Sequence, residues 1–361
     1  MTAFAADRDA FPGVVRPFEA RLVRQEWAAQ AVTPMVDALG ERRPPISVPS
    51  TAYEDSPRAF YVYRMRHGTD DHIGVVADVR LDAVAGGGVR GHESVEPQRV
   101  DALVRYYADL PTRSEPVALL HDHGPGTTRR VEDICRGRPL LHFPGPDGLE
   151  HTVWRVTGDE ETADLASALS RGVHYIADGH HRVAARLVAW ERAGRPADAG
   201  VLCMLFPMDG LTMSAFHRRV TGSVDAASLL DAAARHFEVR RVSAADLTSR
   251  IGMYVAGCWY DLSPTGPRPE GAAGLDASVL QHRLLGPALG ISGQGHPRLE
   301  VVPDQVPLEQ PTARCDDDGG VLFVLRPPSL RRLTRIADLG EQMPPKTTYF
   351  APKPYAGIFV T

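Results

Sequence analysis

The sequence predicts an α/β protein built from two domains, and three observations support this. Segments with the apolar alternation of strands take turns with segments of helical spacing along most of the chain. The 361 residues exceed the length of one average domain. Hydrophobic residues make up 43% of the chain and charged residues 24%, which is typical of a globular protein in water.

The N-terminal part of the chain leads into a predicted hairpin. Residues 14–40 contain Arg16-Pro-Phe and then apolar residues at helical spacing, which predict a helix through Leu22, Trp27, Ala31 and Val36 with a break at Pro34. Residues 41–57 are rich in Arg, Pro and Ser, so we expect a loop there. The next strands, at residues 60–66 and 73–80, are predicted to pair through a polar turn around Gly68.

The rest of the chain alternates between the two kinds of element. Strands are expected at residues 117–120, 152–156, 173–176, 201–206, 253–255, 259–262 and 321–325. Helices are expected at residues 95–109, 160–170, 183–190, 225–237, 276–289 and 330–339, and an extended end at residues 343–360. The character of the chain changes near residues 207–222. This predicts an N-terminal extension at residues 1–58, a first domain at 59–207 and a smaller C-terminal α/β domain at 222–361.

Charge, hydropathy and cysteine usage argue against several classes of protein. The net charge is −5 and the pI about 6.3, so we expect no nucleic acid partner. No apolar run reaches the length of a membrane span, and the first residues lack the apolar core of a secretion signal. The four cysteines are scattered without a Cys-x-x-Cys pair, as in reduced cytoplasmic proteins. We therefore expect a cytoplasmic protein with no membrane partner, and the sequence leaves its oligomeric state open.

The most informative stretch joins a predicted strand to a predicted helix at residues 178–182. Backbone N–H groups and the positive end of the helix dipole face outward at such a junction, which favours a bound phosphate. His180, His181 and Arg182 add hydrogen-bond donors and charge for an anion. The plainer interpretation is a capped helix, in which Asp178 bonds to backbone and the other side chains lie in water. Five consecutive polar or small residues favour the anion site.

A second candidate, Glu93, follows the glycine-rich segment 86–91 and stands near the start of the helix expected at residues 95–109. As an ordinary helix-start residue, its carboxylate interacts with the helix dipole. As a functional residue, it is a general base or a ligand of Mg²⁺ beside a bound nucleotide. Arg99 follows one or two turns along, where its guanidinium either reaches a phosphate or stays in solvent.

Two further polar segments have both a functional and a plain interpretation. In Pro344–Thr348, two prolines hold the chain extended, and Lys346, Thr347 and Thr348 offer a cation and hydroxyls to a carboxylate or phosphate. Without other support, such a segment is an ordinary surface loop. His121-Asp-His123 invites a metal interpretation, but it has no defined third ligand and is better interpreted as a polar loop.

These motifs together resemble those of a known family. Ala177-Asp-Gly-His-His-Arg182, His92-Glu93 and Pro345-Lys-Thr-Thr348 are similar to the motifs of the free serine kinases, which have a nucleotide-binding domain of the ParB/sulfiredoxin type. The likeness extends to longer bacterial relatives of those kinases, known as a domain of unknown function. Arg16-Pro-Phe, Gly252-Met-Tyr and Leu275-Asp-Ala-Ser-Val-Leu280 look like landmarks of that group, so the resemblance covers nearly the whole chain.

The resemblance implies a kinase that transfers a phosphoryl group from ATP or ADP to the hydroxyl of free L-serine, or a close analogue. The product is O-phosphoserine, and Mg²⁺ is the implied cofactor. It also implies that residues 59–207 form a ParB/sulfiredoxin-like nucleotide-binding catalytic domain with a mixed sheet. The C-terminal domain at 222–361 would contribute residues that bind the substrate.

The same resemblance assigns roles to individual residues. Glu93 is expected to accept the proton of the serine hydroxyl, Asp178 to assist at the reacting centre, and the two carboxylates to hold Mg²⁺. The residues expected to bind the nucleotide are Gly179, His180, His181, Arg182 and Arg99. The residues expected to bind serine or its phosphate are His92, Lys346, Thr347 and Thr348.

A nucleotide-sensing regulatory protein is the alternative from a different class. ParB-type domains include such proteins, which bind a nucleotide, change conformation or partner affinity, and have no small-molecule acceptor. A redox enzyme of the sulfiredoxin kind is disfavoured. That chemistry needs a cysteine in the phosphate turn, where this chain has His180 and His181.

Overall fold

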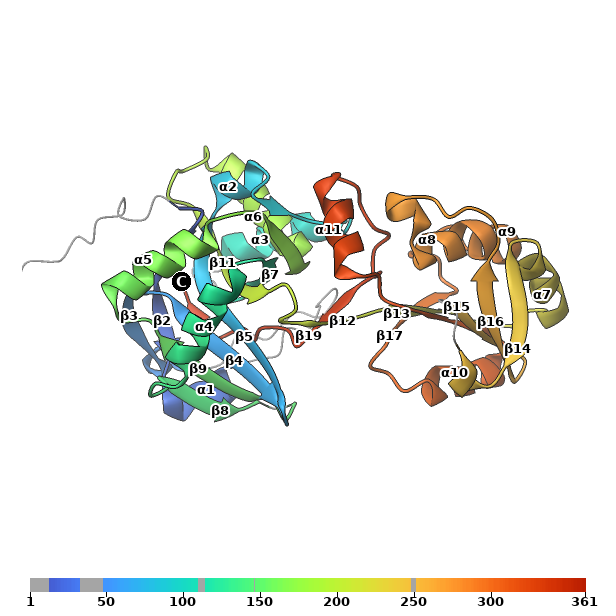
Figure 1. Ribbon diagram of the computed structural model, residues 1–361, viewed down its shortest axis with the longest axis horizontal. Coiled ribbons are helices and arrows are strands. Elements are labelled where there is room, and N and C mark those ends of the chain that lie inside the picture. Colours follow the sequence, from blue (N-terminus) through green and yellow to red (C-terminus); the bar gives the residue numbers. More distant parts are fainter. Residues whose placement is uncertain (1–12, 33–47, 110–113, 146, 248–250) are drawn as a thin grey trace, which may run out of the picture. The chain divides into compact units, whose positions relative to one another are not determined.

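The computed structural model describes residues 13–32, 48–109, 114–145, 147–247 and 251–361 (Figure 1). The chain divides into two compact units. Unit 1 comprises residues 1–91, 95–212 and 352–361, and unit 2 comprises residues 92–94 and 213–351. The three residues His92–Ser94 therefore belong to unit 2, although the chain on either side of them belongs to unit 1. The boundaries predicted from the sequence, with an N-terminal extension, stay predictions.

The elements of unit 1 follow the chain in this order. Its strands are β1 (Val15–Arg16), β2 (Phe18–Val23), β3 (Tyr53–Ala59), β4 (Tyr61–His67), β5 (Asp70–Arg80), β6 (Val89–Arg90), β7 (Val117–His121), β8 (Leu141–Pro144), β9 (Glu150–Arg155), β10 (His174–Asp178), β11 (Gly200–Pro207) and β20 (Phe359–Val360). Its helices are α1 (Ala28–Ala31), α2 (Leu81–Ala85), α3 (Pro97–Asp109), α4 (Gly124–Cys135), α5 (Asp159–Leu169) and α6 (His180–Arg192).

Unit 1 is built on a mixed sheet with the strand order β6-β10-β7-β11-β5-β4-β9-β8, and β1 also pairs with β5. The pairs β6/β10 and β7/β11 are parallel, and the other pairs are antiparallel. The predicted hairpin is confirmed as β4 and β5. Strand β10 lies between β6 and β7, so hydrogen bonds on both sides fix the strand that leads into Asp178.

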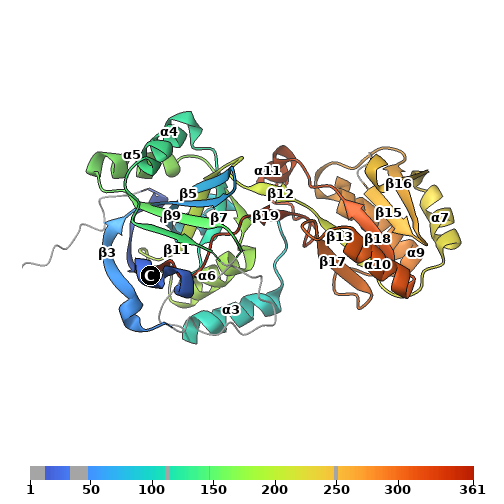
Figure 2. The same cartoon turned by 90° about the horizontal axis from the view of Figure 1, so that it is seen from below.

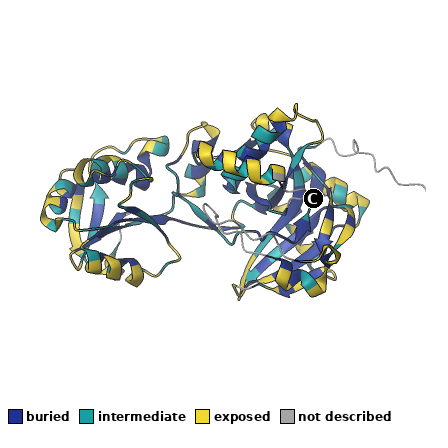
Figure 3. Ribbon diagram, turned by 180° about the vertical axis from the view of Figure 1, so that it is seen from behind, coloured by how far each residue is buried: buried dark blue, intermediate teal, exposed yellow. Residues whose placement is uncertain are grey.

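Helices cover both faces of this sheet. Figure 2 shows α4 and α5 on one side and α6 with α3 on the other. Apolar side chains of the strands and helices form one core cluster, which includes Val62, Leu119, Leu165 and Trp190. The strands are mostly buried, whereas the helices expose their outer faces (Figure 3). A mixed sheet between helices confirms the predicted α/β class.

The end of the chain returns to unit 1. Strand β20 pairs with β2, and β2 pairs with β3, in a small antiparallel sheet. Tyr355, Ile358 and Phe359 are buried, which anchors the segment from residue 352 onward. The extended end predicted from the sequence is confirmed for these residues.

Unit 2 contains the remaining elements. Its strands are β12 (Thr212–Ser214, whose first residue belongs to unit 1), β13 (Phe216–Val220), β14 (Phe237–Val242), β15 (Ile251–Val255), β16 (Cys258–Pro264), β17 (Leu299–Pro303), β18 (Val321–Leu325) and β19 (Tyr349–Ala351). Its helices are α7 (Ala226–Ala234), α8 (Asp276–Leu280), α9 (Gly286–Leu289), α10 (Glu309–Asp318) and α11 (Leu330–Asp338).

The core of unit 2 is an antiparallel sheet with the order β14-β16-β15-β18-β13-β17. Alternation along β15 directs side chains to two faces. Met253 and Val255 join the core cluster that includes Leu229 of α7, whereas Tyr254 packs with Cys315 of α10. Among the described residues of both units, no helix is long and apolar enough to cross a membrane.

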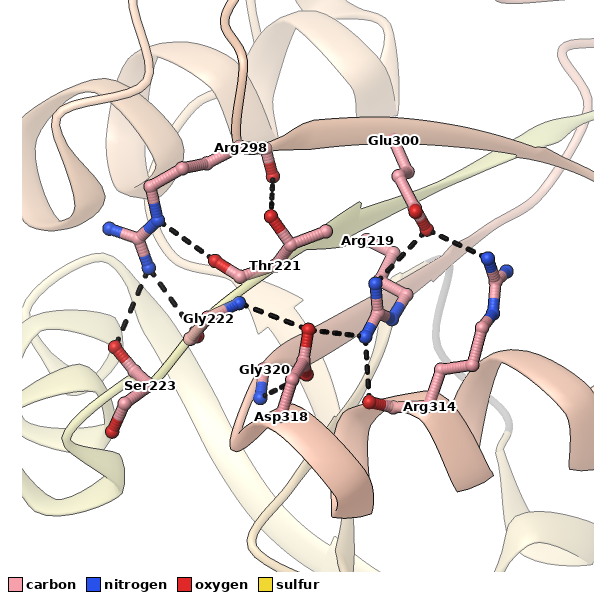
Figure 4. A network of polar contacts seen from close by, with 9 residues as sticks. All are labelled: Arg219, Thr221, Gly222, Ser223, Arg298, Glu300, Arg314, Asp318 and Gly320. Atoms are coloured by element: carbon pink, nitrogen blue, oxygen red, sulfur yellow. Dashed lines mark hydrogen bonds and ion pairs between the residues drawn. The ribbon is translucent and has the colours of Figure 1, made fainter.

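A polar network joins β13, β17 and the end of α10 (Figure 4). Buried Arg219 contacts Glu300 Oε2 at 3.1 Å and Asp318 Oδ2 at 2.7 Å, and donates to the carbonyl oxygen of Arg314 at 2.7 Å. Asp318 also accepts the backbone N–H groups of Gly222 and Gly320 at 3.1 and 2.9 Å. The guanidinium is therefore buried with two carboxylates and a carbonyl around it.

The helix predicted through Leu22, Trp27, Ala31 and Val36 is wrong at Leu22 and is confirmed for α1, which ends at Ala31. Residues 18–23 form strand β2, because Phe18, Ala20 and Leu22 are buried in alternation with exposed neighbours, which is the period of a strand. Residues 33–40 of this prediction lie outside the described part of the chain. Helix α4 was not predicted. It begins at Gly124 and carries Pro125 in its first turn, where a missing N–H leaves no hydrogen bond unmade.

Candidate functional site

The segment Asp178–Arg182, here called the Asp178 corner, lies where β10 passes into α6 in unit 1. Gly179 stands between the strand and the helix with φ of +107°, a left-handed conformation that glycine adopts without steric cost. A Cβ atom at this position would lie 2.9 Å from Nη2 of Arg182. The corner therefore needs glycine for its backbone and for the close approach of a guanidinium.

Two cations hold the carboxylate of Asp178. Arg182 Nη2 donates to Oδ2 at 2.5 Å, and Lys353 Nζ lies 2.7 Å from Oδ1. Arg182 also donates through Nη1 to the carbonyl oxygens of Pro116 at 2.7 Å and Glu115 at 3.3 Å. These side chains are only 11–16% exposed. The guanidinium is therefore fixed by its neighbours rather than extended into solvent.

The histidines of the corner are held by the start of α3 and the chain before it. The backbone N–H of Glu96 donates to Nε2 of His181 at 3.0 Å, so this nitrogen carries no proton. Arg99 pairs with the Glu96 carboxylate at 2.9 Å. His180 is 6% exposed, and its Cδ2 would lie 3.1 Å from a Cβ at Gly91. The corner thus contains four of the five predicted nucleotide-binding residues, and Arg99 lies outside it, paired with Glu96, whose backbone contacts His181.

The second group of predicted residues meets in unit 2. Glu93 Oε1 accepts the backbone N–H of Lys346 at 3.0 Å, and Glu93 forms a parallel bridge with Met343. Nε2 of His92 lies 3.1 Å from Oγ1 of Thr348. Thus the His92-Glu93 motif and the segment Pro344–Thr348, here called the Lys346 loop, are in direct contact.

The Lys346 loop is held in an unusual conformation. Lys346 has φ of +53°, which costs free energy for a residue with a side chain and persists where the surroundings enforce it. Thr347 donates its hydroxyl to the carbonyl oxygen of Pro344 at 2.6 Å. Arg218 Nη2 donates to the carbonyl oxygens of Lys346 at 2.9 Å and Pro345 at 3.3 Å. Burial lowers the pKa of Arg218 to about 10.

Two residues of these groups were not predicted. Lys353 completes the Asp178 corner, and Arg218 supports the Lys346 loop from β13. The residue type of Lys353 could have marked it as a candidate, because lysine is rare in this chain. Arg218 has no comparable signal, since arginine is frequent along the sequence.

The fit of Mg²⁺ to the corner follows from its donor set. Both oxygens of Asp178 face a cation, Arg182 on one side and Lys353 on the other. A divalent cation prefers carboxylate oxygens that are not already neutralised by positive neighbours. Among the described residues, no three His, Cys, Asp or Glu side chains gather as a metal site. As arranged, Asp178 does not fit the predicted role of Mg²⁺ ligand.

Solved structures align with the chain at low identity and low TM-score. A free serine kinase in complex with AMP aligns with a TM-score of 0.40 and 12% identity, covering 77% of this chain and 87% of that one. A hypothetical protein from Pyrococcus furiosus aligns with a TM-score of 0.38, 13% identity and coverages of 79% and 93%. SbnI from Staphylococcus aureus, truncated at its C-terminus, aligns with a TM-score of 0.41, 12% identity and coverages of 77% and 84%.

The sequence comparisons identify a family. No curated protein matches the chain. The family model described as a protein of unknown function, DUF1015, matches residues 51–283, which is more than half of the chain. This region includes the whole Asp178 corner and the His92-Glu93 motif, and it ends before the Lys346 loop. The chain therefore belongs to the DUF1015 family.

Proposed function

We propose that this protein is a kinase that transfers a phosphoryl group from ATP or ADP to the hydroxyl of free L-serine or a close analogue. The observation that carries the proposal is the contact between Glu93 and the Lys346 loop. It joins a carboxylate base to a segment with a cation and two hydroxyl groups, a combination suited to a polar acceptor and its phosphate. The family resemblance of the motifs supports the same reaction.

The Asp178 corner is proposed to receive the nucleotide phosphates. Helix α6 has 13 residues, and the backbone N–H groups of its first turn point outward along the positive end of the helix dipole. Arg182 adds a fixed positive charge beside this turn. Backbone donors with a nearby guanidinium are a common way to bind phosphate oxygens.

The acceptor is proposed to bind beside the Lys346 loop. In unit 2, a pocket borders Thr347 and is also lined by Asp276 and Arg326. The Asp276 carboxylate is buried and already paired with Arg268, so the group that this pocket offers to a substrate is the guanidinium of Arg326. A guanidinium beside the loop matches the carboxylate of a free amino acid.

Glu93 is proposed to act as the general base. Its hydrogen bond from the Lys346 N–H fixes the orientation of the carboxylate. In the reaction, the acceptor hydroxyl oxygen bonds to the terminal phosphorus while that phosphorus separates from the bridging oxygen. The bridging oxygen keeps the electron pair, and the hydroxyl proton moves to Glu93.

The test is a direct assay of the purified full chain. The protein is incubated with L-serine and either ATP or ADP, with and without Mg²⁺, and the products are analysed by mass spectrometry. We expect O-phosphoserine to form with at least one donor. A panel of other hydroxyl-bearing amino acids identifies a close analogue. Saturable nucleotide binding without a phosphorylated product from any acceptor would refute the kinase and support the regulatory alternative.

A further inference from the structure

Lysine occurs at only two positions in this chain. The sequence contains 40 basic residues, and all of them are arginine except Lys346 and Lys353. The last 26 residues contain both lysines and no arginine. The two side chains are not interchangeable, because lysine carries a compact charge with three rotatable donors, whereas arginine carries a planar fork. These two positions therefore call for an ammonium group in a chain that otherwise uses guanidinium.

Lys353 is placed by a well-anchored segment. Its side chain is 12% exposed, and its ammonium lies 2.7 Å from Asp178 Oδ1. Four residues further on, the N–H of Gly357 donates to the carbonyl oxygen of Ser114 at 3.1 Å. The hydroxyl of Tyr53 donates to the carbonyl oxygen of Gly357 at 2.9 Å. The position of Lys353 on Asp178 is thus a fixed feature of unit 1, not a chance contact of a surface lysine.

The charges at this place favour an anion. Asp178 contributes one negative charge, while Arg182 and Lys353 contribute two positive charges, all largely buried. Charges that are partly removed from water interact more strongly than charges in solvent. The surplus of one positive charge stands at the start of α6, whose dipole has the same sign.

We propose that Lys353 is a catalytic residue that contacts the phosphoryl group in transfer, with Asp178 holding its ammonium in place. This inference rests on the proposed kinase function and adds a residue to it. As the acceptor oxygen bonds to phosphorus and the bond to the bridging oxygen breaks, negative charge collects on the phosphoryl and leaving oxygens. The ammonium of Lys353 stabilises that charge, and no proton leaves it.

A lysine suits this role better than an arginine. Arg182 is committed to Asp178 and to the carbonyl oxygens of Pro116 and Glu115, so it is a rigid part of the corner. An ammonium has donors that rotate and a small radius, so it keeps contact with oxygens whose positions change during transfer. The phosphates then meet a guanidinium held by three acceptors and an ammonium that Asp178 holds in place but whose N–H donors rotate.

The experiment measures the affinity of the full chain for ATP, ADP and AMP by titration calorimetry. Three variants are compared with the wild type: Lys353→Met, Lys353→Arg and the control Arg136→Met. Arg136 is 75% exposed on unit 1 and lies outside the corner. AMP lacks the transferred phosphoryl group whether the donor is ATP or ADP. A contact with that group is therefore absent from AMP binding.

We expect Lys353→Met to weaken binding of the phosphoryl donor about tenfold or more, with AMP affinity unchanged. Lys353→Arg should restore much of the donor affinity but leave kcat below that of the wild type. Equal affinity of Lys353→Met and wild type for all three nucleotides would overturn the inference. An equal loss for all three would also overturn it, because it would show that Lys353 is a structural anchor.

If Lys353→Met does not fold, Lys353→Arg is the test. Donor affinity near that of the wild type with a lower kcat would support the inference, and an unchanged kcat would overturn it. A wild type that binds no nucleotide would instead refute the proposed function itself.

Discussion

The carboxylate of Glu93 accepts the backbone N–H of Lys346 at 3.0 Å across 253 positions of sequence. Together with the contact between His92 and Thr348, this bond connects a motif in the first third of the chain to a loop near its end. The two segments were grouped by their resemblance to one family, and the structure brings them into contact within unit 2. Glu93 therefore has two separable properties, the hydrogen bond that it accepts and the base that its carboxylate supplies.

Replacing Glu93 with glutamine should separate these properties. The amide oxygen still accepts the Lys346 N–H, so the loop keeps its conformation, but the side chain no longer takes a proton. We expect kcat to fall about 100-fold or more, with little change in melting temperature. The assay is O-phosphoserine formation, with thermal unfolding as the fold check.

The control for this experiment is Glu191→Gln. Glu191 lies on α6, and its exposed carboxylate pairs with Arg195. We expect it to retain wild-type turnover. Full activity of Glu93→Gln would remove Glu93 from the role of base.

Replacing Gly179 with alanine should distort the Asp178 corner. The substitution adds a Cβ 2.9 Å from Nη2 of Arg182 and places a side chain at φ of +107°. Gly194→Ala is the matched control, since Gly194 has φ of +80° but no atom near the added Cβ. Both variants should lose about 1–2 kcal/mol from the backbone conformation. Only Gly179→Ala should also lose nucleotide affinity in a calorimetric titration, and equal affinities in the two variants would contradict this.

Replacing Arg219 with methionine should destabilise unit 2. The change leaves Asp318 and Glu300 without their shared buried cation (Figure 4). Because the two carboxylates that remain are 34–39% exposed, the expected loss is that of charged hydrogen bonds to a buried guanidinium, about 2–3 kcal/mol. Arg314→Met is the control, because Arg314 meets Glu300 from a half-exposed position and such pairs contribute about 1 kcal/mol or less. Urea unfolding of both variants measures the difference, and similar losses would show that Arg219 is not the centre of the network.

Acid should destabilise unit 1 through its buried histidines. Burial lowers the pKa of His151 to about 4, and burial beside His121 lowers the pKa of His174 to about 4. The rings of His174 and His121 are stacked with centroids 4.3 Å apart. In the unfolded chain, an imidazole has a pKa of about 6.5, so the unfolded state binds protons more tightly. The free energy of unfolding is therefore highest above pH 6.5, where these histidines are neutral in both states. It falls as the pH decreases to about 4, by up to about 3 kcal/mol for each histidine.

The measurement is urea unfolding over this pH range. His174→Gln should reduce the slope of stability against pH, because one of the titrating groups is gone. His236→Gln, at an exposed position, is the control and should keep the wild-type slope. The same slope in both variants would show that His174 is not one of the groups responsible.

The sequence was sufficient to predict elements that depend on local patterns. The hairpin β4/β5 follows from apolar alternation around a polar turn, and this pairing is present. The Asp178 corner was found for the same reason, because a strand, an Asp-Gly turn and a helical stripe are adjacent in the sequence. The α/β class follows from the succession of such elements.

The contacts that complete the candidate site were beyond such patterns. Lys353 meets Asp178, and Arg218 meets the Lys346 loop, through single contacts between segments distant in sequence. No periodicity marks such a contact. The start of the helix predicted at Leu22 failed for a different reason, since Leu22 fits both a helical spacing with the residues after it and a strand alternation with the residues before it.

The assignment of His92–Ser94 to unit 2 has a consequence for anyone who dissects this protein. Expressing residues 213–351 by themselves would supply the strands of the antiparallel sheet and omit Glu93, while shortening the chain ahead of residue 352 would take Lys353 from the corner. No single cut yields two intact halves. Each isolated fragment would lack either Glu93 or Lys353, so loss of turnover in a fragment would say nothing about which half carries the chemistry.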